Sequence, residues 1–149
     1  MTSIARSSSG LRTSMKLLID ANVLLDVLQN RVTFVRASSL VWKLCETQQA
    51  QGFVSALTFA NMVYVMRKEL EPATVEEVLC RLNLIFEFVA LEPADLLHAG
   101  KLQWDDFEDA LQSVTALRLR ADCIVTRNVR DFQQSDVPAC TPDELLARL

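Results

Sequence analysis

Short apolar runs alternate with longer segments of helical periodicity along most of this chain, and the alternation restricts its fold more than any other feature. Four runs are predicted to be strands, at residues 16–20, 53–56, 85–91 and 122–128. Their aliphatic, β-branched and aromatic residues, bounded by polar ones, are typical of buried strands. Because strands that alternate with helices form parallel sheets covered on both faces, we predict a three-layer α/β/α sandwich with a central parallel sheet of four to five strands.

Six segments are predicted to be helices, at residues 31–52, 57–70, 74–84, 92–104, 105–121 and 141–149. In the first, apolar residues recur at helical spacing and Gly52 stands where helices commonly end. Thr74, with Glu77 three residues later, is typical of a capped helix start. Pro142 suits the first position of the last helix.

The 149 residues are enough for one domain with its own core. Half of them are hydrophobic, with only 3 Gly and 4 Pro, which favours a compact domain over disorder. No apolar stretch is long enough to cross a bilayer, so no membrane association is expected. Residues 1–14 are rich in Ser and Arg and are predicted to be a flexible N-terminal extension of a single domain at 15–149, with a transit segment as the alternative.

The cysteines and the single histidine exclude several classes of site. Cys45, Cys80, Cys123 and Cys140 lie far apart in the sequence and form no C-x-x-C pair. We predict that they are buried free thiols in a reducing compartment, and hence that the protein is cytoplasmic. His98 is the one histidine, so a histidine triad and a Cys/His zinc site are both excluded.

Polar residues follow three of the predicted strands. These residues are Asp20 and Asn22 after the first strand, Ser55, Thr58 and Asn61 after the second, and Thr126, Asn128 and Asp131 after the fourth. Ligands of open parallel sheets bind beyond the carboxyl ends of the strands, so we expect these side chains to converge. Asp20 itself has two interpretations, a helix cap or a ligand of a bound ion.

Two further acids stand at the start of the helix at 105–121. Asp106 and Asp109 are three residues apart and therefore lie on the same side of that helix. Helix capping and the helix dipole are one explanation of this pair. However, carboxylates crowded together with Asp20 would repel one another unless a cation joined them. Asp and Asn oxygens without His or Cys are typical ligands of Mg²⁺ or Mn²⁺.

Four stretches, "LLIDANVLLDVL", "SALTFANMVYVM", "DFEDALQSVTA" and "DCIVTRNVRDF", resemble in their order and spacing those of PIN domains. PIN domains are a metal-dependent ribonuclease fold that includes the toxins of VapBC-type toxin and antitoxin pairs. The resemblance runs from about Met15 to the C-terminus. It implies that acids gather at the carboxyl edge of the sheet: Asp20 matches the first acid, Asn22 the polar residue that commonly follows it, and Asp109 the third acid, with Asp106 as a neighbour that shares or replaces its role.

Two positions depart from the family's acidic pattern. Asn61 stands where the second acid is usual, and Asn128 where the fourth is often found. Asp131, three residues further on, either replaces the fourth acid or caps the next turn. Amides keep an oxygen ligand but remove negative charge, so each divalent ion is expected to bind more weakly.

The resemblance implies a metal-dependent ribonuclease, with a small antitoxin protein as a partner. Asp20 and Asp109 are then direct metal ligands, and Asp106 is a ligand or a base. The supporting polar residues are Asn22, Ser55, Asn61, Thr126, Asn128 and Asp131. One alternative is a catalytically degenerate PIN domain that acts as a binding module. Another is a phosphoryl-transfer enzyme of a different α/β family with Asp20 as nucleophile.

The charge distribution limits how RNA could bind. A net charge of −4 argues against tight, unspecific binding to nucleic acid. Arg127 and Arg130 flank Asn128, and we predict that they contact RNA, with ordinary surface charge as the alternative. Apolar residues of the early helices, such as Trp42 and Met66, exceed what one buried face needs, which favours a homodimer.

Overall fold

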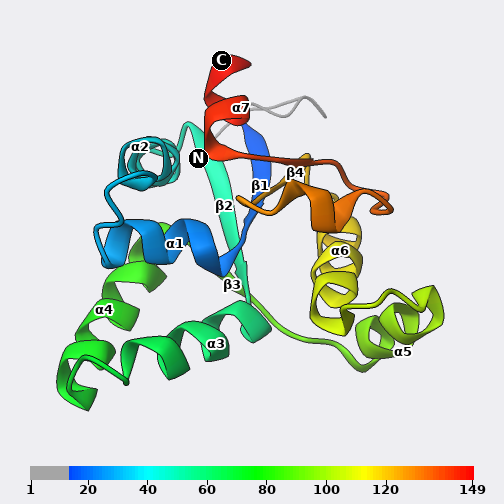
Figure 1. Ribbon diagram of the computed structural model, residues 1–149, viewed down its shortest axis with the longest axis horizontal. Helices are drawn as coiled ribbons and strands as arrows, with labels where there is room; N and C mark the ends of the chain where they lie inside the picture. The colour runs from blue at the N-terminus through cyan, green and yellow to red at the C-terminus, as the bar shows by residue number, and fades with distance from the viewer. Residues whose placement is uncertain (1–13) are drawn as a thin grey trace, which may run out of the picture.

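The computed structural model describes residues 14–149, which form one five-stranded parallel sheet with helices on both faces (Figure 1). The strands lie in the order β3-β2-β1-β4-β5. Their bounds are β1 Met15–Ile19, β2 Ala50–Ser55, β3 Glu87–Val89, β4 Cys123–Val125 and β5 Ala139–Cys140. All four strand pairings are parallel. The predicted three-layer architecture is therefore confirmed.

Within residues 14–149, seven α-helices and one 3-10 helix accompany the strands. They are α1 Ala21–Leu28, α2 Val35–Glu46, α3 Ala56–Met66, α4 Pro72–Ile85, α5 Pro93–Leu102, α6 Phe107–Leu119, η1 Val129–Phe132 and α7 Pro142–Ala147. Figure 1 shows α1 to α4 on one side of the sheet and α5 with α6 on the other. Two core layers result, because residues from α1, α2, α3, α4 and α7 pack with one face of the sheet, whereas α6 and η1 pack with the other.

Strand β1 lies at the centre of the sheet because it is apolar on both faces. Leu17 and Ile19 belong to the core on the side of α1 to α4, while Leu18 belongs to the core under α6. All three are at most 1% exposed. Such a run is typical of a parallel strand buried on both faces. Asp20, which directly follows β1, therefore lies at the middle of the edge formed by the carboxyl ends of the strands.

The helix α1 was not predicted, and the segment after it differs from expectation. Residues 31–52 were predicted to be one helix ending at Gly52, but α2 ends at Glu46 and Gly52 lies inside strand β2. A Cβ atom on Gly52 would lie 2.6 Å from Cys45 Sγ and 2.7 Å from Phe86 Cδ1. Close packing of the strand against its neighbours, rather than a helix end, thus accounts for glycine here.

Two other local expectations were wrong. Helix α4 begins at Pro72 with Glu71 as its N-cap, so Thr74 lies in its first turn and caps nothing. Trp42 and Met66, which suggested a dimer surface, fill the core instead: Met66 is 3% exposed, and the Trp42 ring packs edge-on against Phe86 with 5.3 Å between the centroids. The start of α7 at Pro142 is confirmed.

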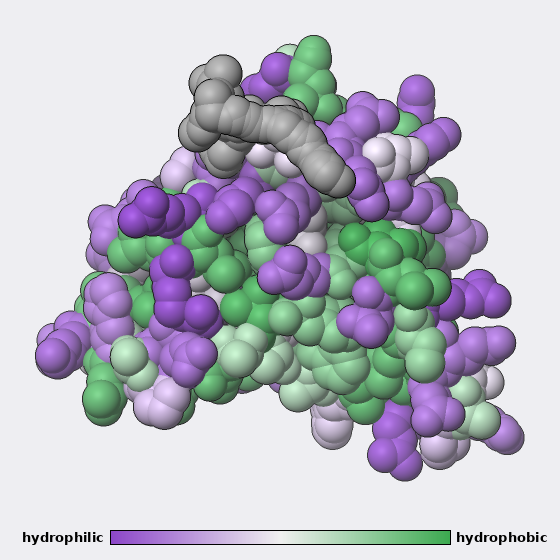
Figure 2. Space-filling view, turned by 180° about the vertical axis from the view of Figure 1, so that it is seen from behind, coloured by the Kyte–Doolittle hydropathy of each residue, from purple (hydrophilic) through white to green (hydrophobic). Residues whose placement is uncertain are grey.

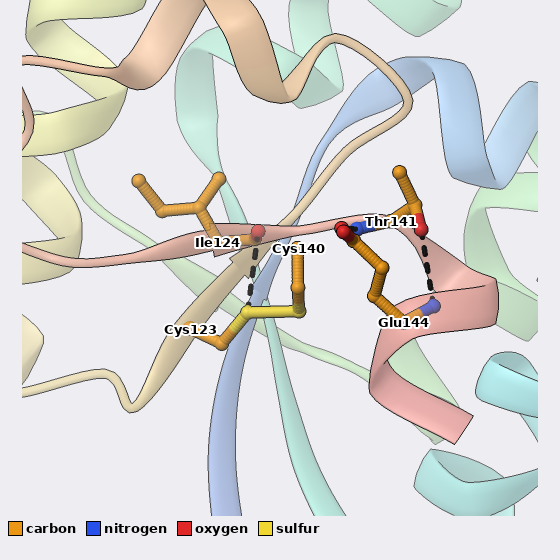
Figure 3. Close-up of a disulfide and its surroundings, with 5 residues drawn as sticks. All are labelled: Cys123, Ile124, Cys140, Thr141 and Glu144. Atoms are coloured by element: carbon orange, nitrogen blue, oxygen red, sulfur yellow. Dashed lines mark hydrogen bonds between the residues drawn. A yellow bond between two sulfur atoms is a disulfide. The ribbon is translucent and has the colours of Figure 1, made fainter. Parts of the chain in front are cut away.

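Cys123 and Cys140 form a disulfide that joins β4 to the edge strand β5 (Figure 3). Both residues are fully buried, and their Cα atoms are 6.6 Å apart. The prediction of four free thiols was therefore wrong for this pair, because neighbouring parallel strands bring together two cysteines that are 17 residues apart. Cys45 and Cys80 are free, the former buried and the latter exposed.

The last helix, α7, is capped at its start. Beside the disulfide, Thr141 and Glu144 cap α7 reciprocally, each side chain accepting a hydrogen bond from the other residue's backbone N–H (Figure 3). Of the predicted extension at residues 1–14, all but Ser14 lies outside the described residues. Across residues 14–149, no helix is both long and apolar enough to cross a membrane.

Candidate active site

Asp20 lies where β1 passes into α1, and both oxygens of its carboxylate accept hydrogen bonds. The backbone N–H of Ala21 donates to Oδ1 over 2.9 Å, and Thr126 Oγ1 donates to Oδ2 over 2.8 Å. Asp20 is thus the N-cap of α1, as one interpretation of the sequence expected. Burial raises the pKa of Asp20, an effect that these two hydrogen bonds oppose and that the charges of Asp131 and Asp106 reinforce.

Asn22 connects the first and fourth strand ends. Its Nδ2 lies 3.4 Å from Asp20 Oδ2 and 3.3 Å from Thr126 Oγ1, while its Oδ1 accepts the backbone N–H of Arg127 over 3.1 Å. The backbone N–H of Asn128 in turn donates to Thr126 Oγ1 over 3.0 Å. The predicted convergence of these two strand ends is therefore confirmed, and Asn128 takes part through its backbone.

The start of α6 brings two more acids to the same place. Asp106 is the N-cap of this helix, with its Oδ1 accepting the backbone N–H of Asp109 over 3.0 Å. The pKa of Asp109 is raised to about 6 by burial, and further by the negative charges of Asp106, Asp131 and Asp20. Salt largely screens exposed charges that are more than about 10 Å apart. Asp20, Asp106, Asp109 and Asp131 therefore form one acidic group, called the acid cluster below.

Asp131 lies in η1, and its charge contributes to the raised pKa of both Asp20 and Asp109. A cleft of about 280 Å³ opens between η1 and the start of α6, and Asp131 lines it with Asp106 and Asp109. Arg130 is exposed on the rim of the same cleft, beside the acids and accessible to an anionic ligand.

The donor chemistry of the acid cluster fits a hard divalent cation. It offers only oxygen ligands, and the mutual repulsion of its carboxylates would be relieved by Mg²⁺ or Mn²⁺. Among residues 14–149, however, no three His, Cys, Asp or Glu side chains are already arranged to hold a metal ion. Side-chain rotation at the exposed residues Asp106 and Asp131 would be needed to close the acids around one.

The second strand end does not join the acid cluster by any hydrogen bond described in this structure. Ser55 is the buried N-cap of α3, and its Oγ donates to Gln112 Oε1 over 2.6 Å. Gln112 Nε2 donates to Thr58 Oγ1 over 3.1 Å. Gln112 was missed by sequence reasoning because a single glutamine within a buried helix stripe gives no distinctive pattern. These residues tie α3 to α6 beneath the site.

Asn61 lies beside a carboxylate that the sequence did not single out. This exposed amide donates from Nδ2 to Glu108 Oε1 over 3.3 Å. Glu108 also contributes to the raised pKa of Asp109. Asn61 is uncharged where an acid is usual in the family, and Glu108 of α6 places a negative charge beside it.

Arg127, predicted to contact RNA, is held by the protein instead. Its Nε donates to Asp26 Oδ2 over 3.0 Å, and its guanidinium carbon lies 3.9 Å from the centre of the Phe34 ring. Asp26 is fully buried and also bonds Arg31 and Ser38. No sequence pattern indicated this network, because Asp26 looks like an ordinary polar position within an apolar run.

Comparison with known proteins identifies a family and a fold. The model of the PIN domain family matches residues 16–130, which is more than half of the chain. No curated protein sequence matches. The match excludes the alternative of an unrelated α/β phosphoryl-transfer enzyme.

Solved structures share the fold at low sequence identity. VapBC2 from Rickettsia felis, bound to a DNA fragment from its promoter, is 14% identical with a TM-score of 0.65, covering 85% of this chain and 98% of that one. A toxin-antitoxin complex from Klebsiella pneumoniae is 23% identical with a TM-score of 0.62, covering 85% and 97%. VapC20 from Mycobacterium tuberculosis, a toxin that cleaves the sarcin-ricin loop, is 11% identical with a TM-score of 0.59, covering 72% and 86%.

Proposed function

Because this chain belongs to the PIN domain family, we propose that it is a ribonuclease that hydrolyses RNA phosphodiester bonds with Mg²⁺ or Mn²⁺. The observation that carries the proposal is the acid cluster at the carboxyl edge of the sheet, where the charges of Asp106 and Asp131 help to raise the pKa of Asp20 and of Asp109. Carboxylates held close together at the expense of repulsion are typical of a site that binds a cation.

In the proposed reaction, each residue of the site would have a distinct role. Asp20 and Asp109 would hold the ion, with Asp106 and Asp131 as further ligands or bases. Thr126 and Asn22 orient the Asp20 carboxylate through the hydrogen bonds described above. Arg130, on the rim of the cleft, would attract the phosphate backbone. The ion, when bound, supplies a Lewis acid for a phosphoryl oxygen and lowers the pKa of a water molecule.

The structural neighbours suggest a partner. The structural neighbours include toxin-antitoxin complexes from Rickettsia felis and Klebsiella pneumoniae. We therefore propose a small antitoxin protein as partner and the cytoplasm, where RNA is abundant, as compartment. A homodimer is also proposed, because large hydrophobic side chains are exposed, among them Tyr64 at 69%, Leu84 at 86% and Leu97 at 71%. Figure 2 shows hydrophobic side chains gathered over the middle of one face, with hydrophilic ones at its margins.

The experiment is RNA cleavage with a matched variant. Wild-type protein and Asp20→Asn, purified identically and shown by light scattering to have the same mass, are incubated with structured and single-stranded RNAs in Mn²⁺, in Mg²⁺ and in EDTA. We expect cleavage by the wild type that needs the metal and falls at least about 100-fold in the variant. A mass of twice 16.7 kDa would support the dimer.

A second outcome would support a different function. If neither protein cleaves RNA, or if the two cleave equally, the ribonuclease proposal fails. The amides Asn61 and Asn128 and the open arrangement of the acids favour, in that case, a PIN domain that acts as a binding module.

A further inference from the structure

A fully buried carboxylate lies outside the acid cluster, near the end of α1. Asp26 Oδ2 accepts hydrogen bonds from Arg127 Nε and Ser38 Oγ, each over 3.0 Å, and its Oδ1 lies 3.4 Å from Arg31 Nη1. Its exposure is 0%. A buried carboxylate with this many donors holds its partners firmly, because each lost bond leaves a desolvated charge.

Arg127 is fixed at both its side chain and its backbone. Asp26 holds the guanidinium against the Phe34 ring, and Asn22 Oδ1 holds the backbone N–H. The residues on either side of Arg127 connect it to Asp20. The backbone N–H of Asn128 donates to Thr126 Oγ1, and Thr126 Oγ1 donates to Asp20 Oδ2. Rotation of the Arg127 backbone would disturb both bonds.

We propose that Asp26 is a positioning residue of the candidate active site: through Arg127 it fixes the segment 126–128 and so holds the Thr126 hydroxyl on the Asp20 carboxylate. Arg127 then belongs to this support and not to the RNA-binding surface. The inference rests on the proposed function only in treating Asp20 as a metal ligand. The contacts from Asp26 to Asp20 are part of the fold itself.

The test compares Asp26→Asn with Asp95→Asn. Asp95 is also buried, with a side chain 3% exposed, and it pairs with Arg118 over 3.0 Å, but it lies on α5 away from the acid cluster. Asp26 pairs with both Arg127 and Arg31, and Asp95 pairs with Arg118, so Asp95→Asn controls for the loss of a buried, paired carboxylate. Amide hydrogen exchange is measured by NMR at positions 127 and 128, relative to Phe86, whose N–H bonds Leu82 O at the end of α4.

We expect relative exchange at positions 127 and 128 to rise about tenfold in Asp26→Asn and to stay unchanged in Asp95→Asn. Unchanged exchange in Asp26→Asn, or an equal rise in both variants, would overturn the inference. Should Asp26→Asn fail to fold, Arg127→Met removes the other partner of the Asp26–Arg127 ion pair. Amide exchange at positions 127 and 128 is then measured in that variant, and unchanged exchange would overturn the inference.

Calorimetric titration with Mn²⁺ separates this inference from the proposed function. We expect the dissociation constant to rise about tenfold in Asp26→Asn and in Arg127→Met, as for other residues that orient a ligand, and not in Asp95→Asn. If the metal affinity of Arg127→Met equals that of the wild type, the inference is overturned. Absence of Mn²⁺ binding by the wild type would contradict the proposed function alone, because the exchange data need no metal.

Discussion

The acids of the candidate active site show how burial and neighbouring charges set the behaviour of single residues. Asp20 and Asp109 both have a raised pKa, with burial as the largest cause in each. Sequence reasoning found both residues from their place after a strand and at a helix start. The direction of the pKa change needed the structure, since it depends first on how deeply each carboxylate is buried and then on which acids lie near it.

The raised pKa of Asp109 predicts that stability without metal depends on pH. A free Asp has a pKa near 3.8, and that of Asp109 is raised to about 6, so the folded protein keeps a proton that the unfolded chain loses between these values. In EDTA, the free energy of unfolding should therefore fall as the pH rises from about 4 to about 6. Urea unfolding at several pH values measures it.

The control for this prediction is Asp109→Asn, which cannot ionise. Its free energy of unfolding should fall less over the same pH range, and any remaining fall should come from Asp20, whose pKa is raised in the same direction. A fall as steep as that of the wild type would show that Asp109 is not its source.

At the scale of elements, β2 illustrates a packing requirement that sequence patterns do not reveal. Gly52 was placed at a helix end because glycine is common there. The structure explains it by the approach of Cys45 from α2 and of Phe86 from the end of α4. The Phe86 contact joins residues 34 apart in the sequence, and no local pattern encodes it.

We predict opposite effects for alanine at two glycines. Gly52→Ala should lower the free energy of unfolding by about 1–3 kcal/mol, because the added methyl group overlaps Cys45 Sγ and the Phe86 ring. Gly100→Ala should raise it by roughly 0.4–1 kcal/mol, since Gly100 lies in α5 with open space around it and alanine favours the helix. Urea unfolding measures both, and equal effects would contradict the packing explanation.

At the scale of the whole molecule, the architecture of the parallel sheet could be predicted only in part. Alternating strand and helix patterns correctly indicated the three layers and the edge at which polar residues meet. The two-residue strand β5, the helix α1 that directly follows the acid, and the disulfide were not foreseen, because each is defined by neighbours distant in sequence. For the same reason the site was predicted through Asp20, Asp106 and Asp109, whereas Asp26, Glu108 and Gln112 were missed.

The disulfide should stabilise the whole fold. The two cysteines are 17 residues apart. A disulfide that closes a loop of this length restricts the unfolded chain and contributes about 3 kcal/mol to the free energy of unfolding. Reducing agent should therefore lower the urea midpoint of the wild type. It should leave Cys140→Ala, which cannot form the bond, unaffected. An equal response in that variant would assign the effect of the reductant to something other than this bond.

The central position of β1 has a consequence for synthesis. Asp20 is made early, yet Thr126, whose hydroxyl orients its carboxylate, follows 106 residues later. At the usual rate of translation the interval is roughly 5–20 s. During that interval the nascent chain lacks β4, η1 and Asp131 and has no assembled acid cluster. The acid cluster can therefore assemble only after the segment that carries Thr126 and Asp131 has been synthesised.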